Sequence, residues 1–307
     1  MSSLISVNHL TRRYGDFCAV NNISFELSAG DILGFLGPNG AGKSSTMQML
    51  SGNLAPTLGE IKINGIDLLE NPTAAKTALG YLPENPPLYG EMTVTEYLMF
   101  CARLHHIKKS QLSKVCDSAI ERCGLTDVQH RLIRNLSKGY QQRVGIAQAI
   151  LHSPPVIILD EPTVGLDPIQ ILEIRKLMKQ LGETHGIILC THILPEVQAV
   201  CNRVQIINHG ELVYSADMET LLNTQTSSFE FTLASDIDGE QLEQHAIFKT
   251  IEKHGDCSFI VESDASAEQI TEYIVKQQWG LKQFAAHQTS LEQIFIELTT
   301  SDETTKS

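Results

Sequence analysis

The hydrophobic pattern of residues 1–222 predicts strands and helices that alternate along the chain. Segments 5–14 ("ISVNHLTRRY") and 20–28 ("VNNISFELS") alternate apolar with polar positions, which is typical of antiparallel strands with one buried face. Three later segments are dominated by continuous apolar runs and match strands buried on both faces. These segments are "DILGFLG" (31–37), "PVIILDEP" (155–162) and "GIILCTH" (186–192).

Helical periodicity separates the buried strands. Buried strands that alternate with helices favour a parallel sheet with crossover helices, and so an α/β fold. A closing hairpin is expected around Gly210, and the chain from Pro86 to about Leu151 is mostly helical in pattern. The clearest helices are expected at 43–50, 141–151 and 169–183.

The composition changes after Leu222. The polar segment "NTQTSS" (223–228) reads as a linker, and beyond it the chain has five lysines, no arginine and fifteen carboxylates. The pattern there is strand, helix near Glu240, two strands, helix, strand and a final helix, an order that resembles a split βαββαβ unit. We therefore expect a larger α/β domain at 1–222 and a small acidic α+β accessory domain, ferredoxin-like, at 223–307.

Charge and composition exclude several classes of protein. A formal net charge of −13 argues against a nucleic-acid partner and against a surface for anionic membranes. No segment approaches the roughly 18 apolar residues of a membrane span, and the first residues lack a signal-peptide core. Seven scattered cysteines without a C-x-x-C pair are typical of a reducing compartment rather than of a metal site. We expect a cytoplasmic protein that reaches a membrane only through a partner.

The segment "GPNGAGKSS" (37–45) matches the phosphate-binding pattern G-x-x-x-x-G-K-[ST]. An apolar strand precedes it and a helix follows, as the cradling of phosphate oxygens by backbone N–H groups requires. Lys43 would place its charge at the β- and γ-phosphates, and Ser44 would offer its hydroxyl to Mg²⁺. The alternative is a glycine-rich turn without a ligand. The candidate binding residues are Gly37, Pro38, Asn39, Gly40, Ala41, Gly42, Lys43, Ser44 and Ser45.

Two carboxylates end the apolar strand "VIILDEP". Residues at the carboxyl ends of parallel strands meet where ligands bind, so Asp160 fits an acid that holds Mg²⁺ and Glu161 fits a base that polarises the attacking water. His192 follows the next apolar run. A lone histidine at a strand end is more often structural, but a position beside these carboxylates favours contact with the γ-phosphate.

The segment "LSKGYQQR" (136–143) offers a second helix start that can cap the helix or hold an anion. The phosphate loop, "LSKGYQQR", "ILDEP", "GLDP" and "TH" follow one another along the chain. With these motifs in this order, residues 4–220 resemble the ATP-binding subunit of ABC transporters. The resemblance implies a P-loop ATPase with a mixed sheet core, an antiparallel β subdomain and a helical subdomain. It also implies ATP and Mg²⁺ as cofactors.

The same resemblance assigns further residues. In that family two nucleotide-binding domains pack head to tail, which implies that Ser137 and Gly139 contact the γ-phosphate held by the other subunit of a homodimer. Tyr14, in "RRYG", matches the aromatic residue that stacks on adenine; the alternative is an aromatic residue of the core at a strand end. Asp167, in "GLDP", matches the loop that couples the two sites.

Two positions depart from the usual family pattern. Lys138 and Tyr140 stand where the common signature has Gly and Gln, and Glu84 in "GYLPEN" replaces the usual glutamine. Both changes resemble an exporter subgroup that includes gliding-motility and antibiotic-resistance ATPases. Glu84 would join Ser44 and Asp160 as a charged Mg²⁺ ligand.

The resemblance implies an ATPase that drives an integral membrane permease on a separate chain, for export, from the cytoplasmic face of the membrane. An import role stays open, because the permease largely sets the direction of transport. One alternative, a soluble ABC protein of DNA repair or the ribosome, is disfavoured by the single ATPase module and the acidic tail. Another, a module that binds ATP without turnover, is disfavoured by Lys43, Asp160, Glu161 and His192.

Overall fold

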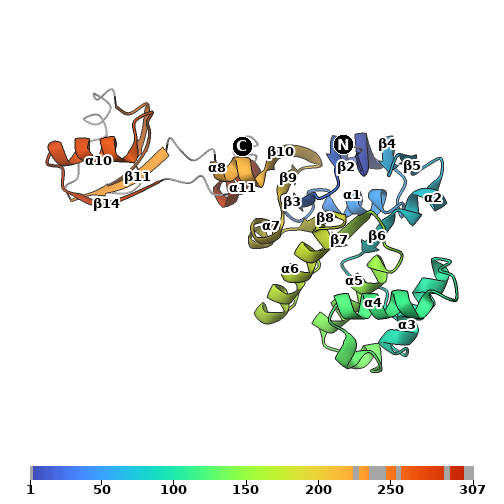
Figure 1. Ribbon diagram of the computed structural model, residues 1–307. Coiled ribbons are helices and arrows are strands. Elements are labelled where there is room, and N and C mark those ends of the chain that lie inside the picture. The colour runs from blue at the N-terminus through green and yellow to red at the C-terminus, as the bar shows by residue number, and fades with distance from the viewer. Residues whose placement is uncertain (1–2, 224–227, 235–246, 254–256, 287–290, 301–307) are drawn as a thin grey trace. The chain divides into compact units, whose positions relative to one another are not determined.

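The computed structural model describes residues 3–223, 228–234, 247–253, 257–286 and 291–300. Contacts between residues divide the chain into two units, and each is described by itself. The first comprises the residues up to Ala216 together with the chain from Leu298 on, and the second comprises Asp217–Glu297. Figure 1 labels the elements of both. Among the described residues, no helix has the length and apolar character needed to cross a membrane.

An antiparallel sheet of four strands, in the order β2-β1-β4-β5, begins the first unit. Its central strand β1 pairs antiparallel with both β2 and β4. Ile5 and Val7 on β1 are buried while polar neighbours are more exposed, as the alternation in the sequence predicts. The strands are β1 (Ile5–Tyr14), β2 (Phe17–Leu27), β4 (Leu58–Ile63) and β5 (Ile66–Asp67).

A mixed sheet of six strands, in the order β10-β9-β3-β8-β7-β6, forms the centre of the first unit. The strands β9, β3, β8, β7 and β6 run parallel to one another, and every residue of β3, β7 and β8 is buried. The continuous apolar runs of the sequence therefore correspond to the strands covered on both faces. The strands are β3 (Ile32–Leu36), β6 (Leu79–Leu82), β7 (Val156–Asp160), β8 (Gly186–Thr191), β9 (Arg203–Asn208) and β10 (Glu211–Asp217).

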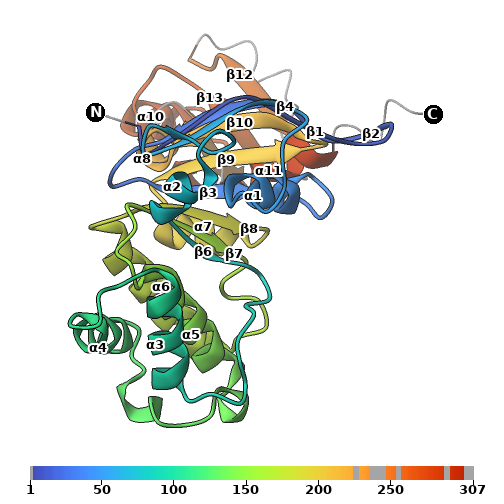
Figure 2. The ribbon, with the colours of Figure 1, turned by 90° about the vertical axis from the view of Figure 1, so that its right-hand side faces the viewer.

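Helices cover both faces of the mixed sheet. Figures 1 and 2 show α1 between the two sheets, and its residues Met47 and Leu50 join a core shared by β1, β3 and β7. The helices α6 and α7 pack together and against β8. The helices α3, α4 and α5 pack together to one side of the sheets (Figure 2), and α5 also packs against β6. The helices are α1 (Lys43–Leu50), α2 (Pro72–Thr77), α3 (Val94–Leu104), α4 (Leu112–Arg122), α5 (Lys138–Ile150), α6 (Pro168–Gly182) and α7 (Leu194–Val200), with short 3₁₀ turns at Thr126–Val128 and Ile133–Asn135.

The helix α5 starts three residues earlier than the periodicity predicts. The apolar pattern places its start at Gln141, whereas the structure places it at Lys138. Ser137 is the N-cap, and its hydroxyl accepts a hydrogen bond from the Tyr140 backbone N–H at 3.4 Å. A capped first turn needs no apolar residue, and for this reason the periodicity does not report it.

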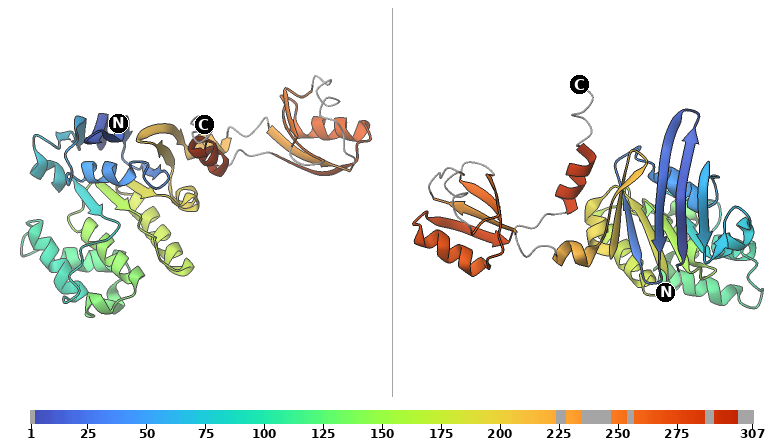
Figure 3. Two further views of the ribbon diagram at one scale, coloured as in Figure 1. Left: turned by 180° about the vertical axis from the view of Figure 1, so that it is seen from behind. Right: turned by 90° about the horizontal axis from the view of Figure 1, so that it is seen from above.

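The second unit contains an antiparallel sheet of four strands in the order β12-β13-β11-β14. Figure 3 shows α10 lying along this sheet. Phe231 and Phe259 form the centre of a core that Ile270 and Ile274 of α10 complete. The predicted helix near Glu240 lies outside the described residues. The elements are α8 (Met218–Asn223), β11 (Ser228–Leu233), β12 (Thr250–Lys253), β13 (Ser258–Glu262), α10 (Ala267–Lys276), β14 (Leu281–Ala286) and α11 (Leu291–Thr300), whose residues from Leu298 on belong to the first unit.

The predicted fold class is confirmed. The first unit has the mixed sheet, the antiparallel sheet and the helical group, and an α+β arrangement follows it. Because β3, β6, β7 and β8 are parallel, their carboxyl ends meet at one edge of the mixed sheet. The residues that follow these four strands include the phosphate loop, Glu84, Glu161 and His192, which the sequence predicts as site residues.

Candidate functional site

A cavity of about 420 Å³ lies at the carboxyl ends of the parallel strands. Its volume falls within the range of small-molecule sites, about 300–1,000 Å³. Residues from five separate segments of the sequence meet in it, and most of the predicted site residues are among them. The cavity is lined by Tyr14, Phe17, Ala19, Asn39, Gly40, Gly42, Lys43, Ser44, Ser45, Glu84, Asp160, Glu161, Val164 and His192.

The loop between β3 and α1 has the backbone of an anion cradle. Gly42, the residue before the helix, has a φ of 107°, and a Cβ there would lie 2.4 Å from the carbonyl oxygen of Ala19. Only glycine fits such a position. No side chain caps the first turn of α1. The N–H groups of this turn are therefore left for a ligand at the positive end of the helix.

Lys43 lies inside this cradle and is 6% exposed. Its Nζ donates to the carbonyl oxygens of Gly37, at 2.7 Å, and of Pro38, at 3.1 Å. Gly37, Pro38 and the buried Ala41 do not line the cavity, in contrast to the other residues of the predicted phosphate loop. The two carbonyls hold the ammonium group at the mouth of the helix, where its charge faces the cavity.

Asp160 is buried at the end of β7, and Glu161 follows it in a left-handed backbone conformation with a φ of 48°. Such a conformation costs a non-glycine residue about 1–3 kcal/mol. The Glu161 N–H donates to the Cys190 carbonyl oxygen on β8 at 2.8 Å, which holds the turn in place. The strained turn points the carboxyl group of Glu161 into the cavity.

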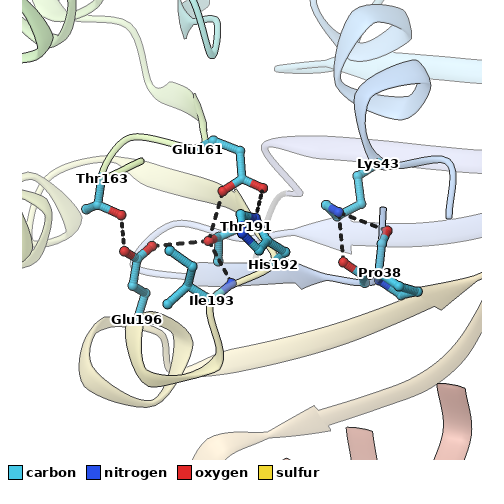
Figure 4. Close-up of polar contacts among 9 residues, drawn as sticks. Pro38, Lys43, Glu161, Thr163, Thr191, His192, Ile193 and Glu196 are labelled. Carbon is cyan, nitrogen blue, oxygen red and sulfur yellow. Dashed lines mark hydrogen bonds and ion pairs between the residues drawn. The ribbon is translucent and has the colours of Figure 1, made fainter. Parts of the chain in front are cut away.

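Glu161 and His192 contact each other directly (Figure 4). His192 Nδ1 lies 2.7 Å from Glu161 Oε1, and the Thr191 hydroxyl lies 3.2 Å from Glu161 Oε2. One carboxylate oxygen therefore has a partner at the end of the neighbouring strand β8 and the other has a partner in the residue directly after it. A protonated imidazole has N–H donors on both nitrogens, so His192 can hold Glu161 with one and offer the other to an anion in the cavity.

The ligands proposed for Mg²⁺ fit a divalent cation by their chemistry. Ser44, Glu84 and Asp160 come from three segments and line the same cavity. Burial raises the pKa of Asp160, and the charges of Glu161 and Glu84 act in the same direction, whereas Lys43 and the Cys190 thiol oppose them. A cation at this place would relieve that crowding of negative charge. The described residues contain no preformed cluster of three acidic, His or Cys ligands, and Mg²⁺ sites that rely on water and phosphate oxygens need none.

Two exposed aromatic residues stand at the edge of the cavity. Tyr14 and Phe17 flank the turn between β1 and β2, and are 45% and 64% exposed. The guanidinium of Arg12 lies 4.5 Å from the centre of the Tyr14 ring and covers one side of it. A planar base could stack on such a surface. The exposure of Tyr14 argues against the alternative of an aromatic residue in the core.

The other predicted residues lie outside the cavity. Ser137 and Gly139 start α5, and Asp167 caps α6, where its carboxylate accepts from the Gln170 N–H at 2.9 Å. The two helix starts are close together, because a Cβ on Gly139 would lie 2.4 Å from the Gln170 side chain. None of the three lines the cavity of its own chain.

Sequence reasoning missed several residues of the site. Phe17, Ala19 and Val164 line the cavity and belong to no motif. An aromatic residue beside the glycine turn after Tyr14 was the available signal for Phe17. The threonines that contact the carboxyl groups, Thr163 and Thr191, gave no signal, because a hydroxyl acquires such a role only through its neighbours in space.

Known proteins resemble both the sequence and the fold. Residues 20–164 match the family described as ABC transporter. The chain is 34% identical over 302 residues to the bacitracin transport ATP-binding protein BcrA of Bacillus licheniformis, across 97% of this chain and 98% of that protein. It is 35% identical over 211 residues to the linearmycin resistance ATP-binding protein LnrL of Bacillus subtilis (strain 168), across 68% of each.

A solved structure of an ATP-binding subunit of an ABC transporter has a TM-score of 0.66 and 29% identity, and covers 72% of this chain and 93% of its own. These matches confirm the family resemblance that the motifs indicated. They also confirm the prediction that the protein binds and hydrolyses ATP. The chain belongs to the family of ABC transporter ATP-binding proteins.

Proposed function

We propose that this ABC ATPase powers an integral membrane permease on a separate chain, and that the transport is export. The observation that carries the proposal is the convergence of the phosphate loop, Asp160, Glu161 and His192 on one cavity. The direction rests on the relatives: one is named for bacitracin transport and another for linearmycin resistance. The protein would act at the cytoplasmic face of the membrane, held there by its permease and without a nucleic-acid partner.

Each residue of the cavity has a role in this proposal. The N–H groups of the phosphate loop and Lys43 hold the phosphates of ATP, and Tyr14 stacks on the adenine. Glu161 orients the attacking water and accepts hydrogen bonds from it, while His192 contacts the γ-phosphate. When bound, Mg²⁺ would neutralise charge on the phosphates, held by Ser44, Glu84 and Asp160.

The functional form in this proposal is a head-to-tail homodimer. The phosphate loop lines the cavity of its own chain, while Ser137 and Gly139 form a second helix start outside it. Facing a partner copy, this second helix start would close over the ATP held by the other chain, and Asp167 would lie between the two sites. Closure on ATP and reopening after hydrolysis would drive the permease.

The role of Glu161 can be tested with Glu161→Gln in the full chain. We expect ATP binding to persist and turnover to fall by about 10²- to 10⁴-fold, which is the usual loss when a general base is removed. ATP should then trap a stable dimer, measurable by light scattering. Glu183→Gln, which alters an exposed glutamate after α6, is the matched control. Near-normal turnover of Glu161→Gln would reject the assignment.

We also propose that the chain divides functionally into a nucleotide-binding domain at 1–222 and an acidic accessory domain at 223–307. The separate core around Phe231 and Phe259 supports an accessory domain that folds by itself. Truncation after Asn223 should leave ATP binding intact and change dimer or permease assembly. Loss of ATP binding in a truncated chain that still folds would show that the boundary is misplaced.

A further inference from the structure

A buried carboxyl group behind the cavity joins the two catalytic loops. Glu196 on α7 is 0% exposed. The Thr163 hydroxyl, two residues after Glu161, donates to its Oε1, and the Thr191 hydroxyl lies 3.1 Å from its Oε2. Figure 4 shows Thr163, Glu196, Thr191 and Glu161 in one continuous row of contacts. Among the residues that the structure describes, these two threonines link Glu196 to the site by hydrogen bonds.

The number of hydrogens that can be donated in this row of contacts shows that one of the two carboxyl groups carries a proton. A threonine hydroxyl has one hydrogen to donate and can accept two hydrogen bonds. Thr191 Oγ1 accepts from the Ile193 N–H at 3.1 Å and also lies within 3.2 Å of carboxyl oxygens of both Glu161 and Glu196. It can donate to only one of them. The other contact is a hydrogen bond only if that carboxyl group carries a proton.

The surroundings assign that proton to Glu196. Burial raises the pKa of Glu196 to about 7, and the negative charge of Glu161 acts in the same direction. The hydrogen bond from Thr191 and the charges of Arg175 and His192 act to lower this pKa. The Cys201 thiol, whose pKa burial also raises, adds no charge here. No ion pair of Glu196 is found among the described residues, whereas Glu161 opens onto the cavity.

The geometry points to Glu196 as a positioning residue: its protonated carboxyl donates to Thr191 Oγ1, and Thr191 in turn donates to Glu161. The acid group thus fastens the loop after β7 to the end of β8 and fixes the orientation of Glu161. It does so without adding a second negative charge behind the proposed γ-phosphate site. This inference rests on the role of Glu161 given under the proposed function.

Steady-state ATPase measurements on the full chain can test this. Glu196→Ala should lower kcat by roughly 10- to 100-fold and change KM by less than about twofold, because the loops lose their common partner and the base its orientation. Glu196→Gln should restore most of kcat, since its amide NH₂ can donate to Thr191 as the protonated acid does. Glu183→Ala, at an exposed glutamate, is the control. Equal kcat in Glu196→Ala and the wild type, or equal losses in the Ala and Gln variants, would overturn the inference.

A pH series that compares Glu196→Gln with wild type tests whether Glu196 carries the proton. This variant is used because it preserves the size and shape of the side chain. As the pH rises past about 7, Glu196 ionises and competes with Glu161 for the one hydrogen of Thr191. The kcat ratio of Glu196→Gln to wild type should therefore be near one at about pH 6 and rise by roughly tenfold towards pH 9. A flat ratio would overturn the assignment of the proton. Failure of the proposed role of Glu161 shows separately, as turnover in Glu161→Gln.

Discussion

Two helix starts of this chain contain a glycine, and they differ in how their backbone N–H groups are satisfied. The start of α1 has no side-chain cap and opens into the cavity beneath Lys43. The start of α5 is capped by its own Ser137 hydroxyl and lies outside the cavity. An uncapped helix start inside a cavity has free N–H groups that can bind an anion in that cavity. At a capped helix start outside the cavity, one of these N–H groups already has an acceptor, and an anion reaches the others only if another molecule brings it.

The two starts also differ in what surrounds their glycines. Gly42 has a backbone that only glycine adopts readily, with the Ala19 carbonyl oxygen behind it. Gly139 has ordinary helical geometry and faces the flexible side chain of Gln170. The glycine before α1 is needed to fold the cradle, and the glycine in α5 is needed only if something must approach it closely. The comparison can be tested at both starts.

The largest effect is expected from Lys43→Ala. Loss of the preorganised ammonium should lower ATP turnover by about 10²- to 10³-fold and weaken ATP binding by the single chain. Lys109→Ala, at an exposed lysine after α3, should leave both unchanged. The measurements are steady-state ATPase rates and nucleotide titrations. Wild-type ATP affinity and turnover in Lys43→Ala would show that the cradle of α1 does not hold the phosphates.

Mixed dimers are the sharpest test of the second helix start. Ser137→Arg should leave ATP binding by one chain unchanged and abolish most hydrolysis, because an arginine would occupy the place of the γ-phosphate brought by the partner. In the head-to-tail arrangement, a linked dimer of Lys43→Ala with Ser137→Arg has one site with both defects and one intact site. In the same arrangement, a linked dimer of the double variant with wild type has one defect in each site.

If the α5 start acts on the partner's ATP, only the first linked dimer can hydrolyse ATP in a single turnover. Single-turnover measurements avoid the silencing that strong coupling between the sites would cause. Activity in the second linked dimer and none in the first would overturn the head-to-tail arrangement.

The two glycines should differ in their effect on stability. Gly42→Ala should lower the free energy of unfolding by about 1–3 kcal/mol, because alanine is strained at positive φ and its Cβ meets a backbone carbonyl. Gly139→Ala should change it by less than about 0.5 kcal/mol, since Gln170 can move and alanine favours a helix. Urea unfolding of both variants measures the difference. Equal losses would contradict the account of the two starts.

The smallest effect is expected from the cap itself. Ser137→Ala removes an acceptor that lies 3.4 Å from the Tyr140 nitrogen, and should cost about 0.5 kcal/mol. Asp167→Ala removes the shorter cap of α6, at 2.9 Å, and should cost about 1 kcal/mol. The same unfolding experiment compares them. A larger loss for Ser137→Ala would show that its contact stabilises α5 more than its length indicates.

The sequence predicted the elements whose signal is local. The buried strands β3, β7 and β8 appear as continuous apolar runs, and α1 has the bounds that its pattern indicates. The cradle residues were also predictable, because a glycine-rich loop between a strand and a helix has few other uses. The start of α5 was less predictable, since a polar first turn held by a cap leaves no hydrophobic signature.

Other features depend on contacts between distant segments. The left-handed turn at Glu161 is held by the Cys190 carbonyl oxygen, and the position of Phe17 at the cavity depends on the turn between β1 and β2. The proton assigned to Glu196 depends on two threonines, one after β7 and one at the end of β8. The sequence alone determined which chemical groups this protein carries and in which kind of element. Only the tertiary structure decided their distances, burial and hydrogen-bond counts, because these depend on residues that are remote along the chain.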